Sequence, residues 1–319
     1  MGSRAIYSVA DARFFLGLVA MINSLRLVGQ GEPILVLDCG LTSEHVQMLR
    51  VEATVIPAPA DEPAHLLKHV LPLAQPADTM LLIDADIVVT RSLDPLFSGA
   101  DDSRGVAFAD ALPDRFDSRW EKLLSLPPVR RQTYVNTGLL ALSKALGVRV
   151  LQDLRDAARH VDLSRSMTGS GDRPDYPFYF LDQDILNAIF ASRLPRGELE
   201  VMEHRLVPHP PFAGLELLDE RRLECAYGDG VQPFALHHIQ AKPWLTAVSP
   251  NLYSRLLPRL LLADDLAIQP TAGMIPLRLR HGRLAAADRR RSAAVARWKR
   301  LRAAVGVRRR LKNLRVDRS

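Results

Sequence analysis

The stretch LLIDADIVV (residues 81–89) sets two carboxylates, Asp84 and Asp86, one residue apart inside an apolar, β-branched run. Such a run is typical of a buried strand. Burying a carboxylate is costly unless it is paired, hydrogen-bonded or bound to metal. At the carboxyl end of a strand in an open α/β sheet, the pair can hold a divalent cation through hard oxygen ligands. The alternative interpretation is that one Asp caps the next turn and the other faces solvent.

Apolar runs and segments of helical periodicity alternate on both sides of this stretch. Strands are predicted at residues 5–10, 33–38, 53–56, 105–110, 134–142 and 234–239, and helices at 12–28, 43–50, 65–73, 144–160 and from 182 onward. This alternation predicts an α/β fold with a mostly parallel sheet that helices cover on both faces. Residues 165–177 are rich in Ser, Gly, Asp and Pro, which predicts a loop.

The composition limits the class of protein. With 319 residues and 47% hydrophobic content, the chain can bury a full core as one large domain. It contains no run of about 18 apolar residues of the kind that spans a membrane, and its first residues are too polar for a secretory signal. Cys39 and Cys225 are too few for a disulfide scaffold or a thiolate metal site. We therefore expect a protein of the reducing cytoplasm.

Charge is distributed unevenly along the chain. From Arg278 onward there are 16 Lys and Arg against 2 Asp and Glu, whereas the preceding residues hold 26 basic and 34 acidic side chains. We expect one domain over residues 1–265 and a basic helical tail over 266–319. One side of the tail helix would carry, at helical spacing, Val295, Trp298, Leu301, Arg302 and Val305.

The basic, amphipathic pattern of this tail is suited to an anionic membrane surface. The expected location is then the cytoplasm, with the tail at the inner membrane leaflet. A solvated tail and non-specific binding of nucleic acid are the alternatives. The acidic body argues against nucleic acid as a partner.

Several short motifs follow one another at a distinctive spacing. They are Val9-Ala10-Asp11, the stretch from Asn23 to Thr42 (NSLR…PILVLDCGLT), Lys68, Asp84-Ala85-Asp86, Asn136-Thr137-Gly138, Asp182-Gln183-Asp184, and a His followed by Lys242-Pro243-Trp244. In this order they resemble the nucleotide-sugar glycosyltransferases of the family-8 type, which include glycogenin and bacterial lipopolysaccharide galactosyl- and glucosyltransferases. The resemblance covers residues 5–262.

The resemblance implies a single domain of the GT-A type, built on a mostly parallel, Rossmann-like mixed sheet. In that family the paired carboxylates and a late His bind Mn²⁺, which bridges the nucleotide diphosphate. The metal role therefore falls to Asp84, Asp86 and either His237 or His238, although a packing role at a strand end is an alternative for either histidine. Two carboxylates with one imidazole suit Mn²⁺ better than Ca²⁺, with Mg²⁺ as the alternative cofactor.

The resemblance also assigns contacts with the nucleotide donor. These fall to Ala10, Asp11, Lys68, Asp84, Ala85 and Lys242. Ala10 and Asp11 would hold uracil and ribose, and Lys242 would meet the diphosphate as a point charge. Asp11 could equally cap a helix, and Lys68 could be an ordinary solvated lysine.

Short polar side chains are expected around the donor sugar. They are Asp110, Asn136, Asp182, Gln183 and Asp184, of which the last three, with Lys242, form the candidate catalytic group. The alternative is that Asp182 caps a helix and Asp184 is an acid in its first turn.

The implied reaction is retaining transfer of a hexose from a UDP-sugar to a hydroxyl of a glycan or lipid-linked acceptor. Gln183 is a poor nucleophile, so attack from the face of the leaving group is favoured over a double displacement. The alternative function is a catalytically silent nucleotide-sugar-binding protein. That alternative arises because the customary Gly between the late His and Lys242 is missing and their spacing is short.

Overall fold

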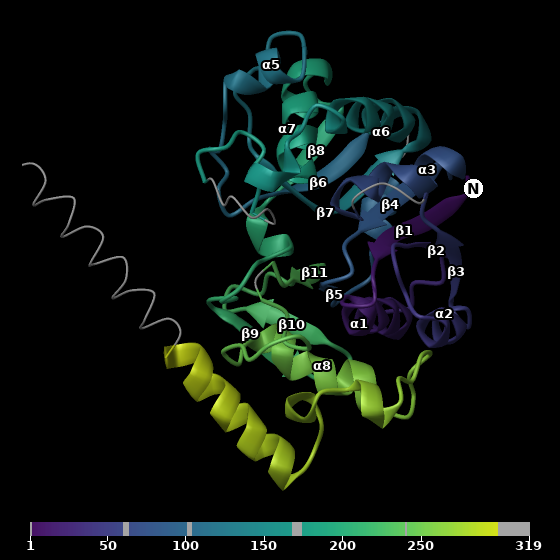
Figure 1. The fold of residues 1–319 in the computed structure, drawn as a ribbon, viewed down its shortest axis with the longest axis vertical. Helices are drawn as coiled ribbons and strands as arrows, with labels where there is room; N and C mark the ends of the chain where they lie inside the picture. Colours follow the sequence, from purple (N-terminus) through teal and green to yellow (C-terminus); the bar gives the residue numbers. More distant parts are fainter. Residues whose placement is uncertain (1, 60–63, 101–103, 168–173, 240, 299–319) are drawn as a thin grey trace, which may run out of the picture.

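The chain forms a three-layer α/β fold around a seven-stranded sheet (Figure 1). The structure is a computed structural model, and it describes residues 2–59, 64–100, 104–167, 174–239 and 241–298. The sheet order is β3-β2-β1-β4-β7-β6-β8. Its pairings are parallel except at β7, which runs antiparallel to both β4 and β6. The predicted mixed, mostly parallel sheet is therefore confirmed.

Most elements lie close to the predicted ranges. The strands are β1 (Arg4–Ala10), β2 (Ile34–Asp38), β3 (Ala53–Pro57), β4 (Thr79–Ile83), β5 (Ile87–Val89), β6 (Gly105–Ala109), β7 (Val135–Ser143), β8 (Leu199–Met202), β9 (Leu215–Asp219), β10 (Glu224–Tyr227) and β11 (Ala235–His237). The α-helices are α1 (Phe15–Leu27), α2 (Ser43–Leu49), α3 (Val70–Ala74), α4 (Asp94–Gly99), α5 (Arg119–Leu123), α6 (Lys144–Ala158), α7 (Asp182–Arg193) and α8 (Leu252–Leu262). Short 3₁₀ helices are η1 (Ala64–His69), η2 (Leu163–Arg165), η3 (His204–Leu206), η4 (Ala272–Met274) and η5 (Leu277–Leu279).

The central strands are buried on both faces because their apolar side chains alternate between two cores. In β4, Leu81 and Ile83 belong to the core shared with α1 and α8, whereas Met80 and Leu82 belong to the core shared with α6 and α7. A strand that is apolar at every position can therefore lie at the centre of the sheet. β4 is thus packed on both faces up to its end at Ile83, where Asp84 follows.

The predicted single strand over residues 81–89 is wrong, because the chain turns at the two aspartates. β4 ends at Ile83, and β5 starts again at Ile87 in a separate two-stranded sheet with β11. The Ile87 N–H donates to the Asp84 carbonyl, which closes the turn. The turn satisfies the backbone while both carboxylates project from it, and a continuous strand would have placed them on the same buried face.

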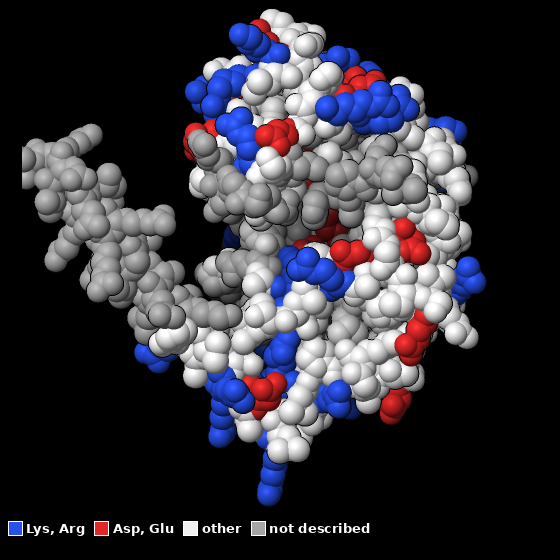
Figure 2. Space-filling model, viewed as in Figure 1, with Lys and Arg blue, Asp and Glu red and all other residues white. Residues whose placement is uncertain are grey.

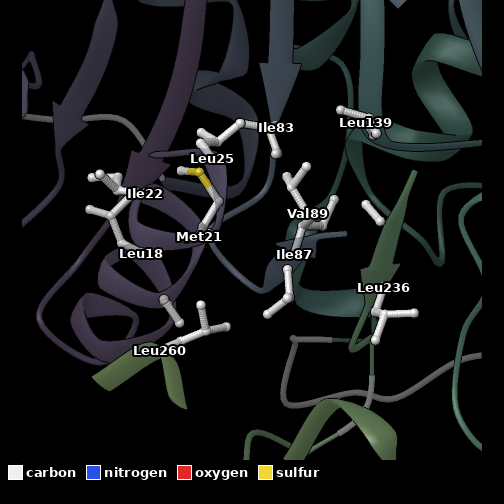
Figure 3. Close-up of a cluster of buried hydrophobic side chains, with 14 of the residues drawn as sticks. Leu18, Met21, Ile22, Leu25, Ile83, Ile87, Val89, Leu139, Leu236 and Leu260 are labelled. Atoms are coloured by element: carbon white, nitrogen blue, oxygen red, sulfur yellow. The ribbon is translucent and has the colours of Figure 1, made fainter. Parts of the chain in front are cut away.

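The small β5–β11 sheet rests on an apolar layer (Figure 3). The layer belongs to one apolar cluster that includes Leu18, Met21, Ile22 and Leu25 of α1, Ile87 and Val89 of β5, Leu236 of β11 and Leu260 of α8. All of these side chains are almost fully buried. The turn that carries the aspartates is thus supported from below by tightly packed helices.

The helix predicted over residues 65–73 is instead the 3₁₀ helix η1 followed by the short α3. Pro72 has no N–H to donate to the carbonyl of Lys68, four residues earlier, so one hydrogen bond of a continuous α-helix is lost at this point. The break matters because Lys68 then lies in η1, next to the end of β4.

The C-terminal part continues beyond α8. Ile268, Ile275 and Leu279 join the α1–α8 core, and a final helix over 283–298 follows at the periphery of the molecule (Figure 1). Of the tail residues grouped by helical spacing, Leu301, Arg302 and Val305 lie outside the described residues. Among the helices that the structure describes, none combines the length and apolar character needed to cross a membrane.

Candidate functional site

The candidate site lies at the carboxyl edge of β4, where β7, β11 and η1 meet. Acidic side chains gather in a hollow near the middle of the face shown in Figure 2. Asp84 and Asp86 point from the turn after β4, with 35% and 9% of their side chains exposed. Ala85 between them is buried, and a Cβ on Gly17 of α1 would lie 2.5 Å from the Ala85 carbonyl oxygen. Close packing of α1 therefore fixes the turn.

The pairing of β5 with β11 brings a histidine to the two aspartates. His237 pairs with Ile87, directly after Asp86, although about 150 residues separate them in the chain. Its Nε2 lies 3.3 Å from Asp86 Oδ1 and 3.8 Å from Asp84 Oδ2. One ligand atom from each of the three residues falls within 4.8 Å of the others, which is the spacing of a metal site.

His238 points the other way, because neighbouring residues of an extended chain project to opposite faces. Its Nε2 lies 3.1 Å from Asn251 Nδ2, and its ring packs 4.9 Å from the ring of Tyr253. Of the two histidines left open by the sequence, His237 is the one beside Asp84 and Asp86.

Hydrogen bonds around Asn136 determine which nitrogen of His237 carries the proton. The Gly138 N–H donates to Asn136 Oδ1, so this atom is an acceptor, and the His237 Nδ1 lies 3.0 Å from the same oxygen. Nδ1 therefore donates to Asn136, which leaves Nε2 as the ring nitrogen that faces the two carboxylates and that could ligate a cation. Such an outer hydrogen bond is the usual way in which a ligating histidine is oriented.

This donor set fits a divalent cation. Asp86 Oδ1 is buried without a hydrogen bond that meets ordinary geometry among the described residues, and Nε2 of His237 lies 3.3 Å from it. Two carboxylates and a neutral imidazole are ligands that Mn²⁺ and related cations accept. Asp84, Asp86 and His237 are therefore the residues that could hold a metal ion.

Two lysines border the carboxylates. Lys68 Nζ lies 3.0 Å from Asp84 Oδ1 and 2.9 Å from Asp182 Oδ2, and it donates to the Thr137 carbonyl at 3.0 Å. Burial lowers the pKa of Lys68, but Asp182 and Asp84 outweigh it, so the pKa is raised and the side chain is charged.

Lys242 donates to Asp86 Oδ2 and to the carbonyl of His238. Burial raises the pKa of Asp86, but the neighbouring Lys242 and His237 outweigh it and hold that pKa well below its usual range. The side chain of Lys242 runs beside Phe14, with Nζ 5.8 Å from the ring centroid. Both lysines predicted to contact the donor thus lie within the candidate site.

A polar cluster lies next to the histidine. Asn136 Nδ2 donates to Asp110 Oδ2 at 3.2 Å and to Gln183 Oε1 at 3.0 Å, and Gln183 Nε2 donates to Asp110 at 3.3 Å. Asp182 joins the same edge through its ion pair with Lys68. The structure therefore brings together four of the five side chains expected around the sugar.

Asp184 is not part of this group. Its carboxylate is fully buried and accepts two hydrogen bonds from Arg115, at 2.7 and 2.8 Å, and one from the Tyr134 hydroxyl at 2.7 Å. The Phe180 N–H donates to it as well. Burial raises the pKa of Asp184, although each of these partners lowers it. These contacts tie the start of α7 to the loop that carries Arg115 and to Tyr134, just before β7.

Ala10 and Asp11 lie at the carboxyl end of β1. Asp11 Oδ1 accepts the N–H groups of Arg13 and Phe14, so this side chain caps the turn into α1. A small pocket lies between β1, η1, α3 and the end of β4, and its lining includes Val9, Lys68 and Asp84. Asp84 thus borders both this pocket and the candidate metal site.

Sequence reasoning missed three residues that shape the site: Gly138, Arg115 and His209. Gly138 is required because a Cβ there would lie 2.3 Å from His237 Cε1, and its place in the Asn-Thr-Gly motif was the available signal. Arg115 and His209 carried no signal, since both lie in loops without periodicity.

His209 packs edge-on between two other histidines, with ring centroids 5.3 Å from His237 and 4.9 Å from His204. Both of its ring nitrogens are buried and lack a hydrogen-bond partner within the described part of the chain. Burial, followed by His237 and His204, lowers its pKa to about 2, so the ring is neutral.

Known proteins match this chain in fold but not in the comparisons of sequence. No protein-family model and no curated protein matches the sequence. Solved structures do match in fold. An active-site mutant of LgtC aligns with a TM-score of 0.55 at 18% identity, covering 84% of this chain and 98% of LgtC.

Two further structures agree. The bifunctional glycosyltransferase WbbM aligns with a TM-score of 0.56 at 13% identity, covering 82% of this chain and 50% of WbbM. The glycosyltransferase GlyE of Streptococcus pneumoniae TIGR4 aligns with a TM-score of 0.52 at 15% identity, covering 82% of this chain and 61% of GlyE. The chain thus spans about half to three fifths of these two proteins. From the sheet order, the site at the end of β4 and these likenesses, we conclude that the chain has the GT-A glycosyltransferase fold.

Proposed function

We propose that this protein is a divalent-metal-dependent glycosyltransferase that moves a hexose from a UDP-sugar to a hydroxyl of a glycan or lipid-linked acceptor. The observation that carries the proposal is the cluster of Asp84, Asp86 and His237, in which Nε2 of the histidine faces both carboxylates. The likeness to LgtC supports it, since one LgtC structure is a galactosyltransferase in complex with donor and acceptor sugar analogues.

In this proposal the chain binds and orients the donor. A bound Mn²⁺ or Mg²⁺ would supply Lewis-acid stabilisation of the departing diphosphate. Lys242 adds a positive charge from the protein, in a site where 12% of its side chain is exposed and water screens it weakly. Ala10 and Asp11 at the end of β1 would hold the nucleoside, and Asp110, Asn136, Asp182 and Gln183 would bond the sugar hydroxyls.

We further propose retention of configuration by attack from the face of the leaving group. A double displacement needs a carboxylate that can reach the sugar as a nucleophile. Asp182 is ion-paired with Lys68, and Asp184 is tied to Arg115 and Tyr134. Gln183 is a poor nucleophile. An oxygen of the departing diphosphate would then accept the proton of the acceptor hydroxyl.

The proposal is tested by binding and turnover. The full chain is screened by thermal shift against UDP-glucose, UDP-galactose, and GDP- and ADP-sugars, each with and without Mn²⁺. We expect stabilisation by a UDP-sugar only with Mn²⁺, slow donor hydrolysis that EDTA abolishes, and loss of both on Asp84→Ala or Asp86→Ala. Full activity in both variants contradicts the metal assignment. Binding without turnover across an acceptor panel favours the silent binding protein instead.

For the C-terminal helix over 283–298, we propose association with an anionic membrane surface. This helix carries Leu284, Val295 and Trp298 among many arginines. These three residues are 76%, 37% and 54% exposed to solvent, respectively. Each basic residue near such a surface contributes about 1 kcal/mol, which salt screens. The full chain should sediment with phosphatidylglycerol vesicles at low salt and not with phosphatidylcholine vesicles. Equal binding to both contradicts the proposal.

A further inference from the structure

Each carboxylate of the candidate metal site also meets a lysine. Lys68 bonds Asp84, and Lys242 bonds Asp86. The two lysines differ in what else holds them. Lys68 has two further partners, Asp182 and the Thr137 carbonyl, whereas Lys242 has only the His238 carbonyl as a second hydrogen-bond acceptor among the described residues.

Each carboxylate oxygen of Asp86 is therefore placed for a different positive group, one for a cation and the other for the Lys242 ammonium. Its Oδ1 faces His237 in the cluster that could hold a cation, and its Oδ2 receives the Lys242 ammonium. An ammonium and a dication on the same carboxylate repel each other strongly where little water screens them, since only 9% of the Asp86 side chain is exposed. The side chain of Lys242 and a dication consequently compete for Asp86.

The charge of the site points the same way. Asp84, Asp86, Asp182 and the adjoining Asp110 carry four negative charges and the two lysines carry two positive charges, which leaves a net charge of −2. A dication alone would neutralise this charge while still sharing Asp86 with an ammonium. A diphosphate brings further negative charge and is a new partner for that ammonium.

We propose that Lys242 exchanges between Asp86 and the diphosphate, so that the dication and the nucleotide bind in mutual dependence. The inference rests on the proposed function and adds a regulation of the same site. Without nucleotide, a dication must displace Lys242 from Asp86. With nucleotide, Lys242 moves to the phosphate, and Asp86 is fully available to the dication. Because coupling is reciprocal, the dication raises the affinity for nucleotide by the same factor.

The test is Lys242→Met, which keeps an unbranched side chain beside Phe14 and removes the charge. Binding of Mn²⁺ to the full chain is measured by electron paramagnetic resonance, with and without UDP. Without UDP, we expect the variant to bind Mn²⁺ at least about tenfold more tightly than the wild type. We also expect the factor by which UDP raises Mn²⁺ affinity to fall by about tenfold, a loss of about 1.4 kcal/mol of coupling.

Two matched variants separate exchange from simple removal of charge. Lys122→Met removes the same charge from an exposed position on α5 and should leave both affinities unchanged. Lys68→Met removes a charge from the site itself. We expect a smaller gain in Mn²⁺ affinity from it, because Lys68 can release Asp84 and keep Asp182 and Thr137 as partners.

Each contrary outcome has a distinct meaning. Equal gains in Lys68→Met and Lys242→Met would show that net charge alone sets Mn²⁺ affinity, which overturns the exchange. An unchanged or weaker Mn²⁺ affinity in Lys242→Met without UDP, with UDP still promoting binding, overturns the exchange and leaves the proposed function intact. Absence of Mn²⁺ binding in the wild type and the variant, even with UDP, overturns the proposed function and the exchange together.

Discussion

Replacing Gly138 by Ala should displace the histidine of the candidate metal site without touching any ligand atom. The added Cβ would lie 2.3 Å from His237 Cε1 and 2.7 Å from its Nδ1. The imidazole must retreat by about 1.1 Å to reach the 3.4 Å at which ordinary contact begins. That shift also disturbs the Nδ1 bond to Asn136, which orients Nε2. Loss of such an orienting contact typically weakens metal affinity by about 10–100-fold.

The assay is Mn²⁺ binding in the presence of UDP, followed by electron paramagnetic resonance, with urea unfolding measured in parallel. Gly99→Ala is the matched control, because its Cβ would meet Val106 Cγ2 at 2.9 Å, away from the site. The control should lose some stability and keep its Mn²⁺ affinity. If Gly138→Ala binds Mn²⁺ as tightly as the wild type, His237 is not a ligand, and the geometry argued above is refuted.

Two further predictions concern buried polar groups. Asp184→Asn should cost about 3 kcal/mol in urea unfolding, because it leaves Arg115 without its charge partner, and should spare UDP-sugar binding; loss of sugar binding at unchanged stability would instead make Asp184 a sugar ligand. His209 has a pKa of about 2 when folded against 6.5 as the ordinary value, so the unfolded chain binds its proton first. As the pH decreases from about 6.5, the free energy of unfolding of the wild type should therefore decrease by up to about 1.4 kcal/mol per pH unit. His209→Phe should be at least as stable as the wild type, and its free energy of unfolding should decrease less steeply. Identical pH profiles would contradict this.

Many strands and helices could be predicted from the sequence because they carry their own periodicity, whereas α4, α5, α8, β8, β9 and β10 were not predicted. β4 is apolar at every position after Thr79, which is how a strand buried on both faces reads. The Asp84-Ala85-Asp86 motif likewise marks the carboxyl edge of that strand, whatever follows in the chain. Fold class and the position of the two carboxylates are thus local information.

Boundaries that depend on a single backbone group were harder to predict. The turn at Asp84–Asp86 divides a run that reads as one strand, because β5 finds a partner in β11 instead of extending the main sheet. The helix expected over residues 65–73 likewise divides into η1 and α3, and Pro72 removes one of the hydrogen bonds that a single helix would have made. Neither the distant strand partner nor the lost hydrogen bond shows in the periodic pattern.

The sequence by itself determined an α/β sheet with a carboxylate pair at the end of a central strand. Tertiary structure alone decided between His237 and His238, because that choice depends on the register of β11 against β5. It also decided that Gln183 faces Asn136 while Asp184, one residue on, binds Arg115, since successive positions of a helix point about 100° apart. Side-chain direction relative to a partner far along the chain is set by packing, and no local pattern in the sequence records it.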